Sequence, residues 1–154
     1  MERHGDGWGV GDAVYACDIK SGNCSDFHSY FIALARAAGI PARFIIGAAV
    51  PSERDDGGVD GYHCWAEFFA DGQWWPVDIS EANKHPMLAD YYFGHHPANR
   101  FELSRGRDLV VNPAPHSGPI NFLDPEEARL IEAREGYGLG RAWEAWKRKA
   151  LKKN

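Results

Sequence analysis

The chain has 154 residues, a formal net charge of −5 and an isoelectric point of about 5.8. That length suits one compact domain, and 44% hydrophobic with 25% charged residues is an ordinary globular composition. The acidic balance excludes nucleic-acid binding as the main role, and no apolar run approaches the ~18 residues of a membrane span.

The N-terminal quarter of the chain is expected to hold a glycine-rich loop and one clear helix. Residues 3–12 form the loop, and residues 13–20 fit either a short helix or a short strand. Residues 24–38 are predicted to form the helix, with Asn23 or Ser25 as its cap. Its buried face should carry the apolar residues that recur at helical spacing, which are Phe27, Phe31, Leu34 and Ala38.

Strands are predicted to follow this helix, at residues 42–50, 62–70 and 73–80. Asp71-Gly72 is a strong signal for a two-residue hairpin turn between the last two of them. Pro76 has no N–H to donate to a neighbouring strand, so the last strand should lie at an edge or contain a local break.

The remainder of the chain is predicted to be irregular before it becomes helical. Residues 81–121 are rich in Pro, Asn and His. Short strands and then two helices are expected, near residues 100–103, 108–111, 124–136 and 141–152. We therefore expect a core domain over residues 1–121 and a C-terminal helical extension over residues 122–154, packed on the same domain.

The predicted hairpin brings a histidine and a carboxylate together. With Asp71-Gly72 as the turn, His63 and Asp78 lie on one face of the sheet as diagonal neighbours. Their backbones would be ~7–8 Å apart, within reach of a His–Asp hydrogen bond. Cys64 would point to the opposite face, which argues against it as their partner.

Cys24 is the nucleophile that such a pair would activate. It stands at the predicted helix start, where the helix dipole and free N–H groups stabilise a thiolate and lower its pKa. The backbone N–H of Cys24 would also be free to hold an oxyanion. A Cys–His–Asp set attacks an amide carbonyl, with His63 as base and then acid and Asp78 as its orienting group.

Each of these residues also has a simpler structural interpretation. A lone Cys is most often core packing, a strand His a satisfied polar residue, and an Asp near a strand end a turn cap. The joint pattern favours chemistry. A zinc site that used Cys24, His28 and the His63-Cys64 pair is disfavoured, because neither CxxC nor HExxH occurs. We therefore expect no metal or other cofactor, and we expect surface positions for the loop histidines His85, His95 and His96.

The number and spacing of the cysteines indicate whether an oxidising or a reducing compartment suits the protein. Three widely spaced cysteines do not form a disulfide framework, although one bridge such as Cys17–Cys24 is compatible with them. Three thiols in a reducing compartment are the simpler interpretation. Because the N-terminus lacks the apolar region of a signal peptide, we expect a cytoplasmic protein or a trimmed domain of an exported one.

Three stretches of the chain resemble the motif blocks of the transglutaminase-like superfamily. They are "GNCSDFHSYFIALARAAGIPARFIIG", "YHCWAEFF" and "WWPVDIS", and they occur in the family's order. The resemblance covers about residues 8–112. It implies an α+β, papain-like core in which an N-terminal helix that bears the cysteine packs on an antiparallel sheet.

The resemblance also implies roles for individual residues. Cys24 would be the nucleophile, His63 the general base and Asp78 its orienting partner. Trp65 would pack around the site, and Glu67 would be a structural hydrogen-bond partner. A second oxyanion donor or a cleft wall would come from the segment before Cys24, where the candidates are Trp8, Tyr15 and the region of Asp18.

The activity that the resemblance implies is thiol-dependent acyl transfer on amide bonds. The family includes protein-glutamine gamma-glutamyltransferases, cysteine peptidases, amidases and inactive scaffolds, and the triad does not distinguish them. Attack by Cys24 would form an acyl-enzyme thioester, which water hydrolyses or an amine captures. This chain is most similar to the compact bacterial and archaeal members, and no calcium-binding loop is evident in it.

The expected partner is a protein or peptide substrate with an amide group, with an amine acceptor if transfer occurs. Neither a nucleic acid nor a membrane is expected as a partner. The rival class is a non-catalytic binding domain that keeps the fold and leaves the chemistry unused.

Overall fold

The computed structural model describes residues 7–50, 62–112, 114 and 118–121. The chain divides into two compact units, Met1–Gly106 and Arg107–Asn154, and the helices and strands of the described residues belong to the first. Residues 51–61 and the predicted helices at 124–136 and 141–152 lie outside the described residues. The domain boundary after residue 121 therefore stays a prediction.

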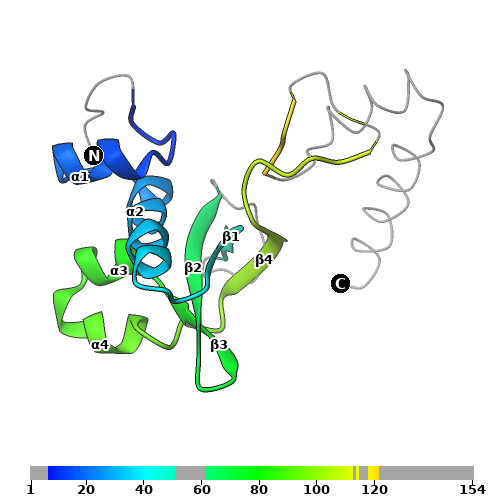
Figure 1. Cartoon of the computed structure of the whole chain (residues 1–154). Coiled ribbons are helices and arrows are strands. Elements are labelled where there is room, and N and C mark those ends of the chain that lie inside the picture. The colour runs from blue at the N-terminus through cyan, green and yellow to red at the C-terminus, as the bar shows by residue number, and fades with distance from the viewer. Residues whose placement is uncertain (1–6, 51–61, 113, 115–117, 122–154) are drawn as a thin grey trace. The chain divides into compact units, whose positions relative to one another are not determined.

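The first unit is α+β, as expected, with helices packed on a four-stranded antiparallel sheet (Figure 1). Helix α1 spans Ala13–Ile19, so the ambiguous segment at 13–20 is helical. Asp12 starts this helix, since its carboxylate accepts hydrogen bonds from the first backbone N–H groups of the helix. Helix α2 spans Cys24–Ala37 and begins at the predicted residue.

The sheet joins strands that lie in different parts of the sequence. Their order across the sheet is β3-β2-β1-β4, and every neighbouring pair is antiparallel. The edge position of β3 confirms what Pro76 required. The strands are β1 (Ala42–Ala49), β2 (His63–Ala70), β3 (Gln73–Val77) and β4 (Arg100–Arg105).

The hairpin register is confirmed. Ala70 pairs with Gln73, and the ladder runs without a shift to Ala66 opposite Val77. Asp71 and Gly72 have φ angles of 51° and 80°, so both turn residues are left-handed. An Asp-Gly pair tolerates that backbone shape, and the right-handed twist of a hairpin favours it.

The predicted strand at 73–80 is too long. β3 ends at Val77, and helix α3 (Ile79–Lys84) begins immediately afterwards. Asp78 stands between the two as the helix cap, because its Oδ1 atom accepts the Glu81 N–H at 3.0 Å. A strand pattern does not reveal this, since the cap bond forms only when the chain turns.

The segment predicted to be irregular contains more regular structure than expected. A 3₁₀ turn at Pro86–Leu88 and helix α4 at Ala89–Tyr92 come first. β4 then extends two residues beyond the predicted 100–103. The strand predicted at 108–111 is wrong: within the described residues, only an isolated bridge between Leu109 and Ile120 occurs there.

Two of the four residues predicted for the buried face of α2 are half-buried, and the other two are exposed. Leu34 is 53% exposed and Ala38 is exposed, whereas Phe31 is half-buried. The buried stripe is rotated and largely polar at its start, consisting of Ser25, Asp26, His28, Ile32 and Ala35. Hydrophobic periodicity could not find this face, because hydrogen bonds satisfy its polar members.

The core lies between α2 and the sheet, and Figure 1 shows α2 alongside β2 and β1. Phe31 of α2 packs edge-on against Phe68 of β2, with ring centroids 6.2 Å apart. The buried members of this cluster are Ile32, Ala35, Ala42, Phe44, Ile46, Cys64, Ala66 and Val77. No helix in the described part of the chain is long and apolar enough to cross a membrane.

A cross-strand ion pair joins two of the motif blocks on the sheet. Arg43 of β1 lies opposite Glu67 of β2, and its guanidinium donates to the Glu67 carboxylate at 2.6 Å. The Arg43 guanidinium also lies 4.0 Å from the centre of the Trp74 ring, a cation–π contact. Glu67 therefore has the structural hydrogen-bond partner that was expected for it.

Candidate active site

The start of α2 places Cys24 at the first position of a fully capped helix. The Asn23 side chain accepts from the N–H groups of Ser25 and Asp26, and the Asp26 carboxylate accepts the Asn23 N–H. This is a capping box, which leaves the Cys24 N–H outside the side-chain cap bonds. A Cβ at position 22 would lie 2.8 Å from the Asp26 Oδ2 atom, so Gly22 makes room for this carboxylate.

Asp26 also holds the glycine-rich loop against the cysteine helix. Its side chain is completely buried and accepts the N–H groups of Gly9 and Gly11, each at 2.9 Å. Trp8, directly before Gly9, is half-buried in this loop. The structure therefore ties the segment that carries Trp8 to the first turn of the cysteine helix.

His63 and Asp78 are brought together as the hairpin register requires. The Nε2 atom of His63 lies 2.6 Å from Oδ2 of Asp78, and the side chains are 11% and 1% exposed. His63 is the first residue of β2, and Asp78 follows the last residue of β3. The ring therefore has its other nitrogen, Nδ1, free to face another group.

Several donors surround the Asp78 carboxylate. The Ser80 hydroxyl donates to Oδ1 at 2.9 Å, the Glu81 N–H donates to the same oxygen, and Arg100 approaches Oδ2 at 3.5 Å. Burial alone would raise the pKa of Asp78, but the hydrogen bond and charge of His63 outweigh it and lower that pKa. Asp78 is therefore held as a carboxylate that cannot rotate away from His63.

The Cys24 sulfur and the His63 ring form a charged pair. A hydrogen bond from the Cys64 side chain has the largest effect on Cys24, and His63 adds another; together they overcome burial and lower the pKa from 9.0 to about 4. Burial would lower the pKa of His63, but its hydrogen bonds to Asp78 and Cys24 raise it from 6.5 to about 9. Both shifts favour the charged forms, a thiolate on Cys24 and an imidazolium on His63.

Cys64 has a place in the site that the sequence did not reveal. Cys64 points away from His63, as predicted, but α2 packs on the face of β2 to which Cys64 points. Its sulfur lies 3.8 Å from both the Ser25 hydroxyl and the Nδ1 atom of His28. Burial is the main reason why the pKa of Cys64 is raised, and the hydrogen bond to Cys24 adds to it. Cys64 therefore stays a thiol that donates to its neighbour.

His28 joins the site from the second turn of α2 and is completely buried. Its Nδ1 atom lies 2.6 Å from the Cys24 carbonyl oxygen, and its Nε2 atom accepts the Ile79 N–H at 3.0 Å. Burial, the largest effect, lowers the pKa of His28. The sequence pattern had marked His28 only as a metal-ligand alternative.

The other face of the site is aromatic and basic. Trp65 is 2% exposed, and its ring lies 6.3 Å from the ring of His63 and 5.4 Å from that of His96. His96 is therefore half-buried against an aromatic ring rather than a plain surface residue. The Arg100 side chain is 5% exposed, and no sequence motif in its segment marks it as part of the site.

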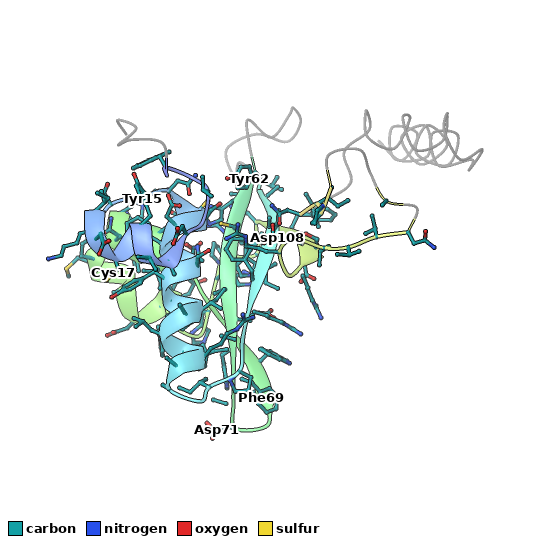
Figure 2. All side chains as sticks on the ribbon, turned by 45° about the horizontal axis from the view of Figure 1, so that its top comes forward. Tyr15, Cys17, Tyr62, Phe69, Asp71 and Asp108 are labelled. Carbon is teal, nitrogen blue, oxygen red and sulfur yellow. The ribbon has the colours of Figure 1, made fainter. Side chains whose placement is uncertain are left out.

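The remaining candidates lie farther from the chemistry. Tyr15 is half-buried on α1, where its ring packs on Gly7, and Asp18 is exposed on the same helix. Figure 2 shows Tyr62 at the end of β2 that lies beside the start of α2, and its hydroxyl is 3.1 Å from that of Ser25. Tyr62 is 47% exposed there, so a partially accessible hydroxyl borders the cysteine helix.

The three cysteines are free thiols in different surroundings. Cys17 is exposed on α1, Cys24 is half-buried and Cys64 is buried. The Cys17 sulfur lies 3.9 Å from the Tyr30 hydroxyl. The bridge between Cys17 and Cys24 that the sequence left open is therefore not formed in this structure.

Comparison with known proteins identifies the family of the chain. Residues 2–79 match the family described as Transglutaminase-like superfamily, and that range contains Cys24, His63 and Asp78. A relative from Haemophilus influenzae, named only as an uncharacterized protein, is 33% identical over 156 aligned positions. The match covers 79% of this chain and 42% of the relative, so the chain spans less than half of that protein. No solved structure matches the chain.

Proposed function

Because this chain belongs to the transglutaminase-like superfamily, we propose that it catalyses thiol-dependent acyl transfer on amide bonds, with Cys24, His63 and Asp78 as its triad. The observation that carries the proposal is the 2.6 Å hydrogen bond between His63 and Asp78, which polarises a ring that also interacts with the Cys24 sulfur. A thiolate at a helix start, paired with an imidazolium, is the reactive state of a cysteine nucleophile.

In the first half of the reaction, the Cys24 thiolate attacks the carbonyl carbon of the amide. The developing oxyanion is stabilised by the Cys24 N–H, which lies outside the side-chain cap bonds at the start of α2. His63 then donates its proton to the amide nitrogen, the C–N bond breaks and the amine leaves. The product is a thioester on Cys24 and a neutral His63 that Asp78 keeps oriented.

In the second half, neutral His63 accepts a proton from water or from an incoming primary amine. The activated oxygen or nitrogen attacks the thioester, and the Cys24 thiolate is released. Water yields a carboxylic acid, as in a peptidase or amidase, and an amine yields a new amide, as in a transglutaminase. The substrates are proteins or peptides that present an amide, with an amine acceptor in the second case.

A generic acyl donor tests the nucleophile before the natural substrate is known. With p-nitrophenyl acetate, we expect a burst of p-nitrophenol equal to the enzyme concentration, and an acetyl group on Cys24 by mass spectrometry. Cys24→Ala should abolish the burst. Cys17→Ala removes an exposed thiol on α1 and is the matched control, which should retain the burst.

The burst experiment also has a result that would contradict the proposal. If wild type gives no burst, or if Cys24→Ala gives the same burst, the chemistry is absent and the non-catalytic binding domain is the better assignment. If the burst is present, a blocked glutamine-containing peptide with and without a fluorescent primary amine separates the two reactions. The free acid alone indicates hydrolysis, and the fluorescent amide indicates transfer.

A further inference from the structure

His28 makes two hydrogen bonds that together connect the elements on which the triad is built. Cys24 belongs to α2, and Asp78 lies at the junction of β3 and α3, 50 or more positions later in the chain. The imidazole contacts the carbonyl oxygen of Cys24 at 2.6 Å and the N–H of Ile79 at 3.0 Å. These groups belong to the peptide units that directly follow the nucleophile and the carboxylate.

The hydrogen-bond partners determine the tautomer of His28. The Ile79 N–H is a donor, so Nε2 must be the acceptor and carries no proton. The Cys24 carbonyl is an acceptor, so Nδ1 must carry the proton and donate it. A protonated ring would set two N–H donors, those of Nε2 and Ile79, against each other, and the ring is therefore neutral.

The groups that face His28 agree with a neutral ring. The Asp78 Oδ1 atom lies 3.6 Å from Nε2 and would favour protonation, but the ring is wholly buried and this oxygen is already bound by Ser80 and Glu81. The Cys64 sulfur lies 3.8 Å from Nδ1, and the Cys24 thiolate is also nearby. Because His28 does not take a proton, the Asp78 charge remains directed at His63.

We propose that His28 is a positioning residue for the acyl-transfer reaction, a buried neutral imidazole that clamps the Cys24 and Asp78 peptide units at a fixed separation. The role in catalysis rests on the proposed function, whereas the two hydrogen bonds of His28 do not depend on it. His28 does not contact the reacting atoms. It acts through the position of Cys24 relative to the His63–Asp78 pair, where a misplacement of about 1 Å costs on the order of 100-fold in rate.

Three substitutions separate the two hydrogen bonds. His28→Asn places an amide N–H near the position of Nδ1, so it keeps the donor to Cys24 and loses the acceptor for Ile79. His28→Gln extends further and can keep the acceptor while it loses the donor. His28→Phe fills the same space and loses both. Ile32→Ala, one turn later on the same buried stripe, is the matched control for lost packing.

The first readout is the rate of iodoacetamide modification of Cys24 against pH, together with the burst with p-nitrophenyl acetate. We expect His28→Phe to raise the apparent Cys24 pKa and to lower the burst rate on the order of 10- to 100-fold. His28→Asn and His28→Gln should fall between it and wild type. Ile32→Ala should lower the melting temperature with a near-normal Cys24 pKa. If His28→Phe folds and matches wild type or Ile32→Ala, the inference is wrong.

The second readout does not depend on activity or on a variant that folds. The ¹⁵N shifts of the His28 ring in wild type should report the neutral Nδ1–H tautomer, unchanged between pH 5 and pH 8. A ring that titrates in this range, or that carries its proton on Nε2, overturns the inference. A neutral Nδ1–H ring in a protein without a burst would contradict the proposed function alone, which keeps the two failures distinct.

Discussion

The Nε2 atom of His63 lies 2.6 Å from the Oδ2 atom of Asp78, and both side chains are almost completely withdrawn from solvent. The same carboxylate uses its other oxygen to cap α3. One aspartate therefore ends a strand, starts a helix and holds the imidazole. The orientation of His63 depends on the backbone at Asp78, between β3 and α3, as much as on the side chains.

The pH dependence of amide turnover should follow the charged pair. Above pH of about 4, Cys24 loses its proton and becomes the attacking thiolate, so kcat/KM should rise with pH through that value. Above pH of about 9, His63 loses the proton that the leaving amine needs, so kcat/KM should fall again. Both values belong to the pair rather than to either residue alone. A profile that rises only above pH 8 would show that Cys24 has an ordinary thiol pKa.

Asp78→Asn should separate the electrostatic role of this residue from its capping role. Asparagine can keep the cap bond to the Glu81 N–H, but its amide would turn N–H groups toward the donors of His63 and Arg100, so the melting temperature should also fall. The negative charge beside His63 is lost, and activity should fall by roughly 10²–10⁴-fold, as when a triad carboxylate is replaced. Glu81→Gln removes a charge from the same helix turn and should keep most of the activity. Equal losses in the two variants would point to a general charge effect.

Replacing Cys64 should weaken the thiolate at Cys24. The Cys64 side chain makes the hydrogen bond that lowers the Cys24 pKa most, so Cys64→Ala should raise that pKa. Each unit of rise lowers the thiolate fraction about tenfold at a pH below the pKa. Cys64→Ser keeps a donor and should lie closer to wild type, and Cys17→Ala should not differ from it. The rate at which iodoacetamide modifies Cys24 at pH 5 compares these three variants with wild type. An unchanged rate in Cys64→Ala would contradict the expectation.

Asp26→Asn should destabilise the protein and loosen the loop that carries Trp8. The buried carboxylate accepts three backbone N–H groups, and an amide would direct N–H groups of its own at some of them. Each donor left unpaired costs about 1–3 kcal/mol, which urea denaturation would measure. Asp12→Asn, at the exposed cap of α1, is the matched control. It should lower the free energy of unfolding by only a few tenths as much. Equal costs at the two positions would mean that burial of Asp26 contributes nothing.

The local features of the site could be predicted from the sequence. Asn23 followed by Cys24 and an acidic first turn predicted where the cysteine helix starts, and Asp71-Gly72 predicted the register that places His63 and Asp78 on one face. These signals succeed because a cap bond and a two-residue turn form between residues close in the chain. The contacts they determine need little information from the rest of the fold.

The tertiary structure alone decided which face of α2 is buried and what the opposite face of β2 contacts. The sequence predicted an apolar face that includes Leu34, whereas the structure buries Asp26 and His28. Polar residues can occupy a buried stripe when partners distant in the chain satisfy them, as Gly9, Gly11 and Ile79 do here. Tertiary packing also brings Cys64 to the site, although it faces away from His63. The helix that bears Cys24 packs on the side of the sheet to which Cys64 points.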